Sequence, residues 1–298
     1  MNKRIDSILS QIKLLGINRT VRFMMEPVIE KKNILRLFVE NRSGVEIGGP
    51  SSIFFSNKPL SIYPFVKSLD NVNYGLVTIW NEKAPASNLF QFGNRFGKQF
   101  IMEASNLKSI QNDSYDFVAS SHMLEHLSNP VKALFEMKRV VNNEGFIILV
   151  VPHKEITFDH KRKTTSIAHM IDDFDKNLPE GDISHLDLGE IANDYDFQLD
   201  HGIASKEEFI ARTMNNNSNR ALHQHVFETE TVLQLLNYCG LKIVLVRPTL
   251  SYGILVVSQK LSGLNDNMIY QNNEEFLSCT SPWRKHSPFK LDKICNTV

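Results

Sequence analysis

The sequence predicts an α/β fold built on a mostly parallel sheet. Between residues 44 and 152, short apolar segments alternate with stretches of helical periodicity, which is typical of parallel sheets. After residue 240, two apolar segments are separated only by Pro248–Ser251, so we expect them to form an antiparallel hairpin. The 298 residues are enough for one large domain, or for a domain with a sizeable insertion.

The first part of the chain reads as helical up to residue 43, with Pro27 interrupting the pattern. Residues 44–48 then predict a short buried strand that ends in a glycine turn. Residues 71–80 and 99–103 have the composition of two further strands.

The centre of the chain gives the strongest pattern. Residues 115–120 predict a strand, and Pro130 suits the first turn of a helix that continues through Val140 and ends near Gly145. Residues 146–151 are continuously apolar, as expected of a central parallel strand.

The pattern changes after this strand. Residues 154–225 are polar and rich in histidine, so we expect a helical cap inserted after the fifth strand. A helix at 228–239 and the hairpin strands 241–247 and 252–259 complete a main domain that spans 44–261. The tail, 262–298, is rich in Asn and Ser, which predicts loose order.

Composition excludes several classes of protein. Thirty-three basic residues balance thirty-three acidic ones, which argues against nucleic acid as a partner. The three cysteines are widely spaced and form no CxxC pair, which favours a reducing, cytoplasmic compartment. Because no apolar stretch approaches the roughly 20 residues that span a membrane, we expect no integral membrane segment.

A glycine turn follows the first predicted strand, at Val45–Ser52. Ligands of open parallel sheets bind at the carboxyl ends of strands, where glycine lets the backbone approach closely. Pro50 stands where a dinucleotide motif needs its second glycine, and the phosphate-binding GK[ST] sequence is absent. A cofactor without a pyrophosphate fits this turn better.

The chain resembles class I S-adenosylmethionine-dependent methyltransferases, of the kind with a type 11 domain. The resemblance rests on Glu46 with Gly48 and Gly49, and on the run from Tyr115-Asp116 through His122-Met123-Leu124-Glu125-His126 to Gly145. It implies a Rossmann-like sheet of seven strands whose last strand is antiparallel, and S-adenosyl-L-methionine as the cofactor.

The resemblance also implies which residues bind that cofactor. Members usually hold the ribose with an acidic residue after the second strand, where this chain offers Asn81 or Glu82. An acidic residue followed by Ala lies near the adenine, and the backbone after the fourth strand lies near the sulfonium. The implied cofactor-binding set is Glu46, Gly48, Gly49, Pro50, Asn81, Glu82, Glu103, Ala104, Ser121 and His122.

Beyond the core, His153, Thr157–His160, Arg162 and His223–Phe227 resemble a bacterial group associated with surface-polysaccharide biosynthesis. This second resemblance implies a sugar or glycan acceptor. A hydroxyl acceptor needs a base, most often histidine. Seven of the ten histidines lie between residues 153 and 225. His153, directly after the fifth strand, and His160 beside Asp159 are the candidate catalytic residues.

Other interpretations remain open. His223-x-His225, or Asp159 with His160, could ligate a metal, but no H-E-x-x-H motif is present and we expect none. Another small molecule could be the acceptor, or the chain could be a catalytically silent binding subunit. Neither the oligomeric state nor the methylated atom follows from the sequence.

Overall fold

A computed structural model describes residues 33–56, 58–78, 89–197, 199–200, 202–249 and 253–263. Most of the N-terminal segment predicted to be helical and nearly all of the tail lie outside these residues. The described end of the N-terminal segment holds one helix, α3 (Arg36–Val39).

The described strands form one eight-stranded sheet in the order β3-β4-β2-β1-β5-β6-β8-β7. Five strands run parallel to one another: β1, β2, β4, β5 and β6. The strand β8 pairs antiparallel with both of its neighbours, β6 and β7. The Rossmann-like fold and its antiparallel last strand are thus confirmed. The strands are β1 (Ser43–Ile47), β2 (Ser68–Asn73), β3 (Leu89–Phe92), β4 (Arg95–Ile101), β5 (Tyr115–Ser121), β6 (Val141–Val151), β7 (Lys242–Thr249) and β8 (Gly253–Gln259).

Two strand predictions need correction. The sheet has eight strands and not seven, because β3 pairs antiparallel with β4 across a tight turn at Gly93, whose φ is 64°. The second strand ends at Asn73, whereas the sequence pattern predicted an end at residue 80. Its neighbours β1 and β4 supply paired backbone only as far as Asn73, so nothing extends the strand further.

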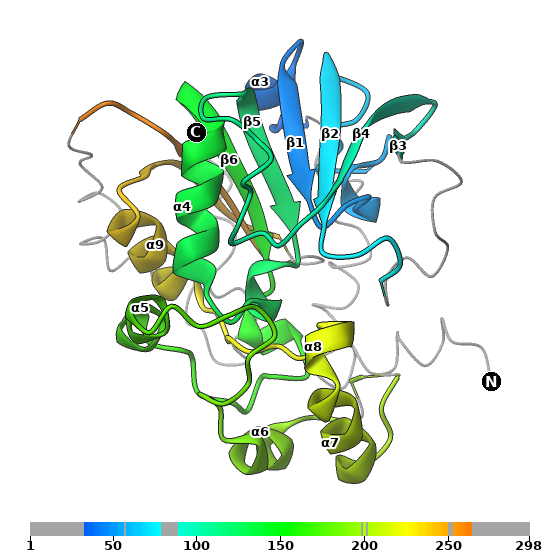
Figure 1. The fold of residues 1–298 in the computed structure, drawn as a ribbon, viewed down its shortest axis with the longest axis vertical. Helices are drawn as coiled ribbons and strands as arrows, with labels where there is room; N and C mark the ends of the chain where they lie inside the picture. The colour runs from blue at the N-terminus through cyan, green and yellow to red at the C-terminus, as the bar shows by residue number, and fades with distance from the viewer. Residues whose placement is uncertain are drawn as a thin grey trace, which may run out of the picture.

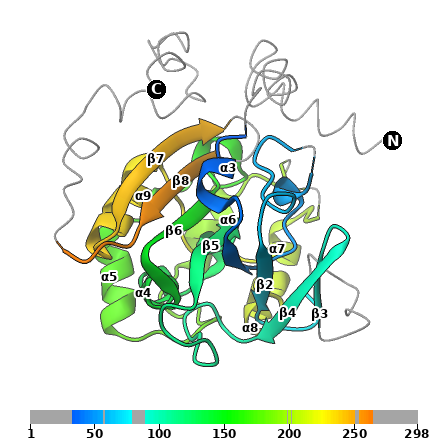
Figure 2. The same ribbon diagram turned by 90° about the horizontal axis from the view of Figure 1, so that it is seen from above.

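Helices cover both faces of the sheet (Figures 1 and 2). On one face, α4 (Pro130–Val140), α5 (Ile167–Asp175) and α9 (Thr229–Tyr238) bury a large apolar core. On the other, α3 and the short 3-10 helix η1 (Ser52–Phe54) enclose a second core. Side chains of β5 alternate between them, because neighbouring strand residues point to opposite faces.

The helix α4 follows the predicted start and ends earlier than predicted. Pro130 occupies its first turn, and the Asn129 side chain accepts a hydrogen bond from the Lys132 amide at 3.0 Å. The helix ends at Val140. Gly145 therefore does not end the helix. A glycine is required there because a Cβ atom would lie only 2.7 Å from the Asp116 carbonyl oxygen on the paired strand β5.

The segment between β6 and α9 lies beyond the carboxyl ends of the parallel strands (Figure 1). Besides α5 it contains α6 (Leu188–Asp194), α7 (Lys206–Met214) and α8 (Asn216–Asn219). The α6 and α7 region has a small core of its own around Phe209 and Tyr195. We call residues 154–225 the cap insertion. Among the described helices, none combines the length and apolarity that a membrane-spanning segment requires.

Candidate active site

A cavity of about 580 Å³ lies between the carboxyl ends of the strands and the cap insertion. Its sheet wall follows the ends of β1, β2, β4 and β5, as the position rule for open parallel sheets requires. Its cap wall is rich in charged side chains: Glu180, Asp200, Arg212, Arg220 and His223, together with Phe158 and Ala221. The cavity therefore has a sheet wall and a cap wall that differ in composition.

The glycine turn after β1 is held by side chains of β2. Gly48 has a φ of 89°, and both it and Pro50 line the cavity. The Gly49 amide donates to Asn71 Oδ1 at 3.0 Å, and Asn73 Nδ2 donates to the Gly49 carbonyl at 2.7 Å. Because of these two bonds, the amide and the carbonyl of Gly49 point toward β2. Gly49 itself is not among the described residues that line the cavity.

Glu46 supports this turn from beneath. Its fully buried carboxylate accepts hydrogen bonds from the Ser51 amide at 2.9 Å and from the Tyr63 hydroxyl at 2.7 Å. Burial raises the pKa of Glu46 to about 7, although the hydrogen bonds from Ser51 and Tyr63 oppose the rise. In the described part of the chain, Glu46 shapes the turn and does not line the cavity.

Residues for the ribose and adenine were expected after β2 and β4. Asn81 and Glu82 lie outside the described residues. Glu103 and Ala104 do line the cavity, directly after β4. The Glu103 carboxylate forms an ion pair with Arg220 of the cap insertion at 2.7 Å, so one contact joins the two walls.

Ser121 and His122 line the cavity at the end of β5, where the sulfonium was expected. The φ of His122 is 52°, a left-handed conformation that is uncommon outside glycine. This turn carries the chain from the strand into η2 (Leu124–His126), whose Glu125 and His126 also line the cavity.

The structure places two candidate bases away from the cavity lining. His153 is 2% exposed, and its Nδ1 accepts the Glu155 amide at 3.3 Å, which begins η3 (Lys154–Ile156). His160 Nε2 lies 2.9 Å from Asp196. Neither histidine is among the described residues that line the cavity. Among the described contacts, none joins the Asp159 carboxylate to the ring of its neighbour His160.

Asp159 instead pairs with His223, which the sequence analysis named as a possible metal ligand and as part of the second resemblance, but not as a candidate base. Its Oδ2 lies 2.6 Å from His223 Nδ1, and its Oδ1 accepts Arg162 Nη1 at 2.7 Å. Burial alone would raise the pKa of Asp159, but His223 and Arg162 outweigh burial and lower it. The ionised carboxylate therefore orients a histidine that lines the cavity.

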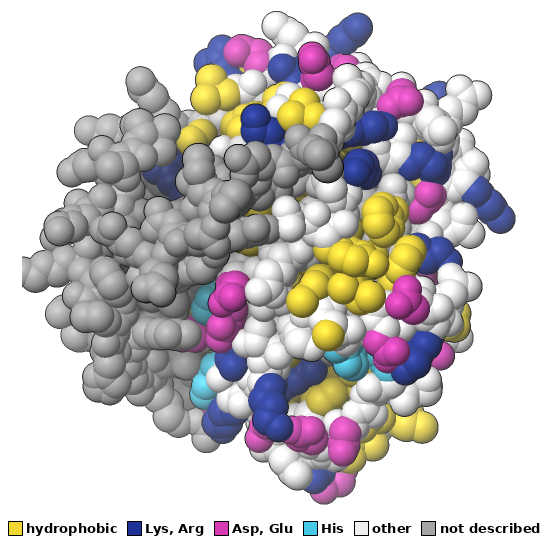
Figure 3. All heavy atoms as spheres, turned by 90° about the vertical axis from the view of Figure 1, so that its left-hand side faces the viewer, with side chains coloured by type: hydrophobic (Ala, Val, Ile, Leu, Met, Phe, Trp, Pro, Cys, Tyr) yellow, Lys and Arg dark blue, Asp and Glu magenta, His cyan; other side chains and the backbone are white. Residues whose placement is uncertain are grey.

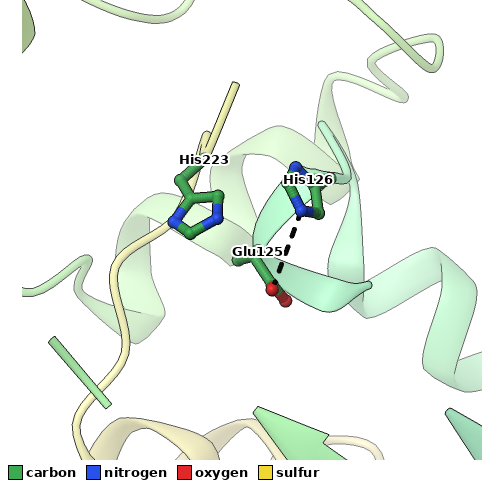
Figure 4. A group of neighbouring side chains, drawn as sticks. All are labelled: Glu125, His126 and His223. Atoms are coloured by element: carbon green, nitrogen blue, oxygen red, sulfur yellow. Dashed lines mark ion pairs between the residues drawn. The ribbon is translucent and has the colours of Figure 1, made fainter. Parts of the chain in front are cut away.

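Glu125 and His126 stand beside His223, as Figure 4 shows. The ring centres of His126 and His223 are 4.7 Å apart, and His126 Nε2 lies 3.7 Å from the Glu125 carboxylate. Glu125 is 1% exposed, and neither of its oxygens has a hydrogen-bond partner among the described residues. Burial raises the pKa of Glu125, against the opposing charges of His122 and His223. Donor atoms of Glu125, His126 and His223 lie within 4.8 Å of one another, close enough to share a cation.

Comparison with known proteins adds a family match. Residues 71–149 match the family described as "Methyltransferase domain". This segment runs from within β2 to within β6 and includes Glu103, Ala104, Ser121 and His122. Residues 71–149 are thus similar to a methyltransferase domain. Among curated proteins, none matches the sequence.

Solved structures of methyltransferases are similar at low identity. A SAM-dependent methyltransferase from Methanosarcina mazei has 15% identity and a TM-score of 0.42, over 78% of this chain and 99% of that one. A putative methyltransferase from Bacillus halodurans has 12% identity and a TM-score of 0.42, over 81% and 98%. A putative S-adenosylmethionine-dependent methyltransferase from Listeria monocytogenes has 12% identity and a TM-score of 0.42, over 80% and 99%.

Proposed function

We propose that the protein transfers the methyl group of S-adenosylmethionine to a hydroxyl oxygen of a sugar or glycan intermediate, with His223 as the general base. One observation carries this proposal. His223 lines the cap wall of the cavity while its Nδ1 is bound to the buried carboxylate of Asp159 at 2.6 Å.

The pairing with Asp159 sets the tautomer of His223. Because an ionised carboxylate only accepts hydrogen bonds, Nδ1 carries the proton and Nε2 keeps a lone pair. A histidine held in this way by a carboxylate can take a proton from an alcohol, as in other enzymes that use the pair. Asp159 is a positioning residue in this arrangement, and Arg162 fixes its second oxygen.

The reaction is an in-line displacement, so alignment supplies much of the catalysis. The acceptor oxygen forms a bond to the methyl carbon as the carbon–sulfur bond breaks, and the electron pair of that bond stays on sulfur. The acceptor proton passes to His223 Nε2. The sheet wall near Ser121 and His122 would hold the cofactor, and the cap wall would hold the acceptor.

The character of the cap wall supports a polar acceptor. Arg212 forms an ion pair with Asp200 at 3.1 Å, and Arg220 pairs with Glu103. Phe158, whose ring centre lies 4.6 Å from that of His223, adds one apolar face. Ionic groups beside a single ring suit the hydroxyls and the apolar face of a sugar better than they suit an extended aromatic or lipid acceptor.

Calorimetric titration of the purified protein with S-adenosylmethionine and S-adenosylhomocysteine tests the first step. We expect saturable binding of both, and absence of binding would overturn the proposal. A fractionated pool of sugar nucleotides and glycan intermediates, incubated with labelled cofactor, tests the second step. Cofactor binding without transfer to any fraction would favour a catalytically silent binding subunit instead.

A further inference from the structure

A second group of titratable side chains lies in the cap insertion, apart from the cavity. His169 and Asp173 are one turn apart on α5, His185 follows that helix, and His225 precedes α9. Of the described residues that line the cavity, none belongs to this group. The proposed methyl transfer gives these four side chains no part.

Three imidazole rings converge on one carboxylate. His185 Nδ1 lies 2.9 Å from Asp173 Oδ1, while His169 Nε2 and His225 Nε2 lie 3.3 and 3.8 Å from Oδ2. The ring centres are 5.3 Å apart for His169 and His185, and each is 5.8 Å from that of His225. Three imidazoles bound to one tetrahedral ion through 2.0–2.1 Å bonds would have ring centres about 5 Å apart.

Two buried groups at the centre of this cluster have no hydrogen bond of normal geometry to the described residues, although the Ser128 backbone interacts with the His225 ring. Within the described residues, neither Asp173 Oδ2 nor either ring nitrogen of His225 has a hydrogen-bond partner of normal geometry. The side chains of both residues are at most 1% exposed. Burying such groups without partners is costly, and native structures seldom leave them so. A cation between them would satisfy both.

The surroundings orient His185 as a ligand. Its Nε2 bonds Gln224 Oε1 at 2.9 Å, and the Gln224 amide nitrogen donates to the His126 carbonyl and to Ser128 Oγ. These bonds fix the amide, so Nε2 is the protonated nitrogen of His185 and Nδ1 faces Asp173. Histidine ligands of metals usually donate their second nitrogen to an oxygen in this manner.

We propose that His169, Asp173, His185 and His225 bind one divalent transition-metal ion of the zinc type. Three imidazoles and one carboxylate form a closed, four-ligand set, which is typical of a structural site. Figure 3 shows histidine side chains at the surface on the side of the molecule that carries α4, α5 and α9. The side chain of His169, on α5, is 36% exposed. An ion can therefore enter from solvent on this side.

Such an ion would join parts of the chain that are distant in sequence. It would tie α5 and the loop with His185 to the segment that follows His223. The backbone of that segment is bound to the Glu125 carbonyl through the Gln224 and His225 amides, at 2.7 and 3.2 Å. The metal site would thus hold the cap insertion against η2, whose Glu125 and His126 line the cavity.

Metal analysis of the full-length protein tests this proposal. After expression in zinc-supplemented medium and gel filtration, we expect about one equivalent of tightly held metal. Replacing it with Co²⁺ should give the visible absorption of a tetrahedral ion. In His169→Gln and Asp173→Asn, metal affinity should fall about tenfold or more. His160→Gln, which changes another cap histidine that pairs with an aspartate, should keep it.

Two results would overturn the proposal. The first is wild-type protein that is free of metal and does not bind added Zn²⁺ or Co²⁺ in titrations. The second is equal metal affinity of the wild type and of His169→Gln, measured by competition with a chelator, which would mean binding elsewhere. His169 lies at the surface, so His169→Gln should fold even if Asp173→Asn does not.

Discussion

At the scale of single residues, the site depends on a pair that is distant in sequence. Asp159 and His223 are 64 positions apart and meet through the irregular backbone of the cap insertion. No local periodicity predicts such a contact. The sequence offered Asp159 and the neighbouring His160 as candidate catalytic residues, but the structure pairs His160 with Asp196. Glu103, Ala104, Ser121 and His122, which the family resemblance named, line the cavity, in keeping with the rule that ligands of parallel sheets bind at strand ends.

His223→Gln should lower the methyl-transfer rate by about 10²–10⁴-fold, because the acceptor loses its base. Affinity for S-adenosylhomocysteine should stay within a few-fold, since the cofactor wall is unchanged. Asp159→Asn should lower the rate as well, by disturbing the tautomer of His223. The matched control is His160→Gln, which should retain wild-type activity. Rates from initial velocities and affinities from calorimetry would measure these effects, and a fully active His223→Gln would exclude the assigned base.

Glu46 gives a pH dependence of stability whose sign is fixed. The pKa of Glu46 is raised by burial to about 7 in the folded protein, against 4.5 ordinarily. Below the lower value both states are protonated. As pH rises from 4.5 to 7, Glu46 ionises in the unfolded chain before it ionises in the folded protein, so the free energy of unfolding falls. Above the folded pKa both states are ionised, and the free energy of unfolding levels off.

Comparison with Glu46→Gln isolates this contribution. The free energy of unfolding of wild type minus that of the variant should fall by about 3 kcal/mol across this range, at roughly 1.4 kcal/mol for each pKa unit. Urea denaturation in a series of buffers measures it. A difference that does not change with pH would show that Glu46 is not buried as an ionisable group.

At the scale of elements, the segment from β5 through α4 to β6 was largely predictable. The helix start at Pro130 and the apolar run at 146–151 are local features of the sequence. In the structure α4 begins at Pro130, and the apolar run lies within β6. The end of β2 and the extra strand β3 were not predictable in this way. Both depend on which neighbours offer paired backbone, and that is decided by the whole sheet.

Loss of the N-cap side chain of α4 should lower the free energy of unfolding more than loss of an exposed N-cap side chain does. Asn129 is buried, accepts the Lys132 amide and also donates to the Asp173 carbonyl at 3.2 Å. Asn129→Ala should lower the free energy of unfolding by about 2 kcal/mol, at the upper end for N-caps. Ser205→Ala, at the exposed start of α7, should cost about 0.5–1 kcal/mol. Chemical denaturation compares the two, and equal losses would contradict the account.

At the scale of the whole molecule, the sheet supplies one wall of the cavity and the cap insertion supplies the other. The family match covers the part of the sheet wall that β2, β4 and β5 supply, but not the glycine turn after β1. The cap wall carries the Asp159–His223 pair and the Arg212–Asp200 ion pair, and the histidine cluster lies elsewhere in the cap insertion. If the proposed reaction is right, we expect substitutions in the cap insertion to change the choice of acceptor.

The most direct test follows a labelled methyl group. The wild-type protein, given methyl-labelled S-adenosylmethionine and a pool of sugar and glycan intermediates, should form S-adenosylhomocysteine together with an O-methylated sugar that carries the label. His223→Gln should bind the cofactor and leave the pool unlabelled. Label on nitrogen, carbon or an aromatic acceptor, or a variant as active as the wild type, would contradict the proposed reaction.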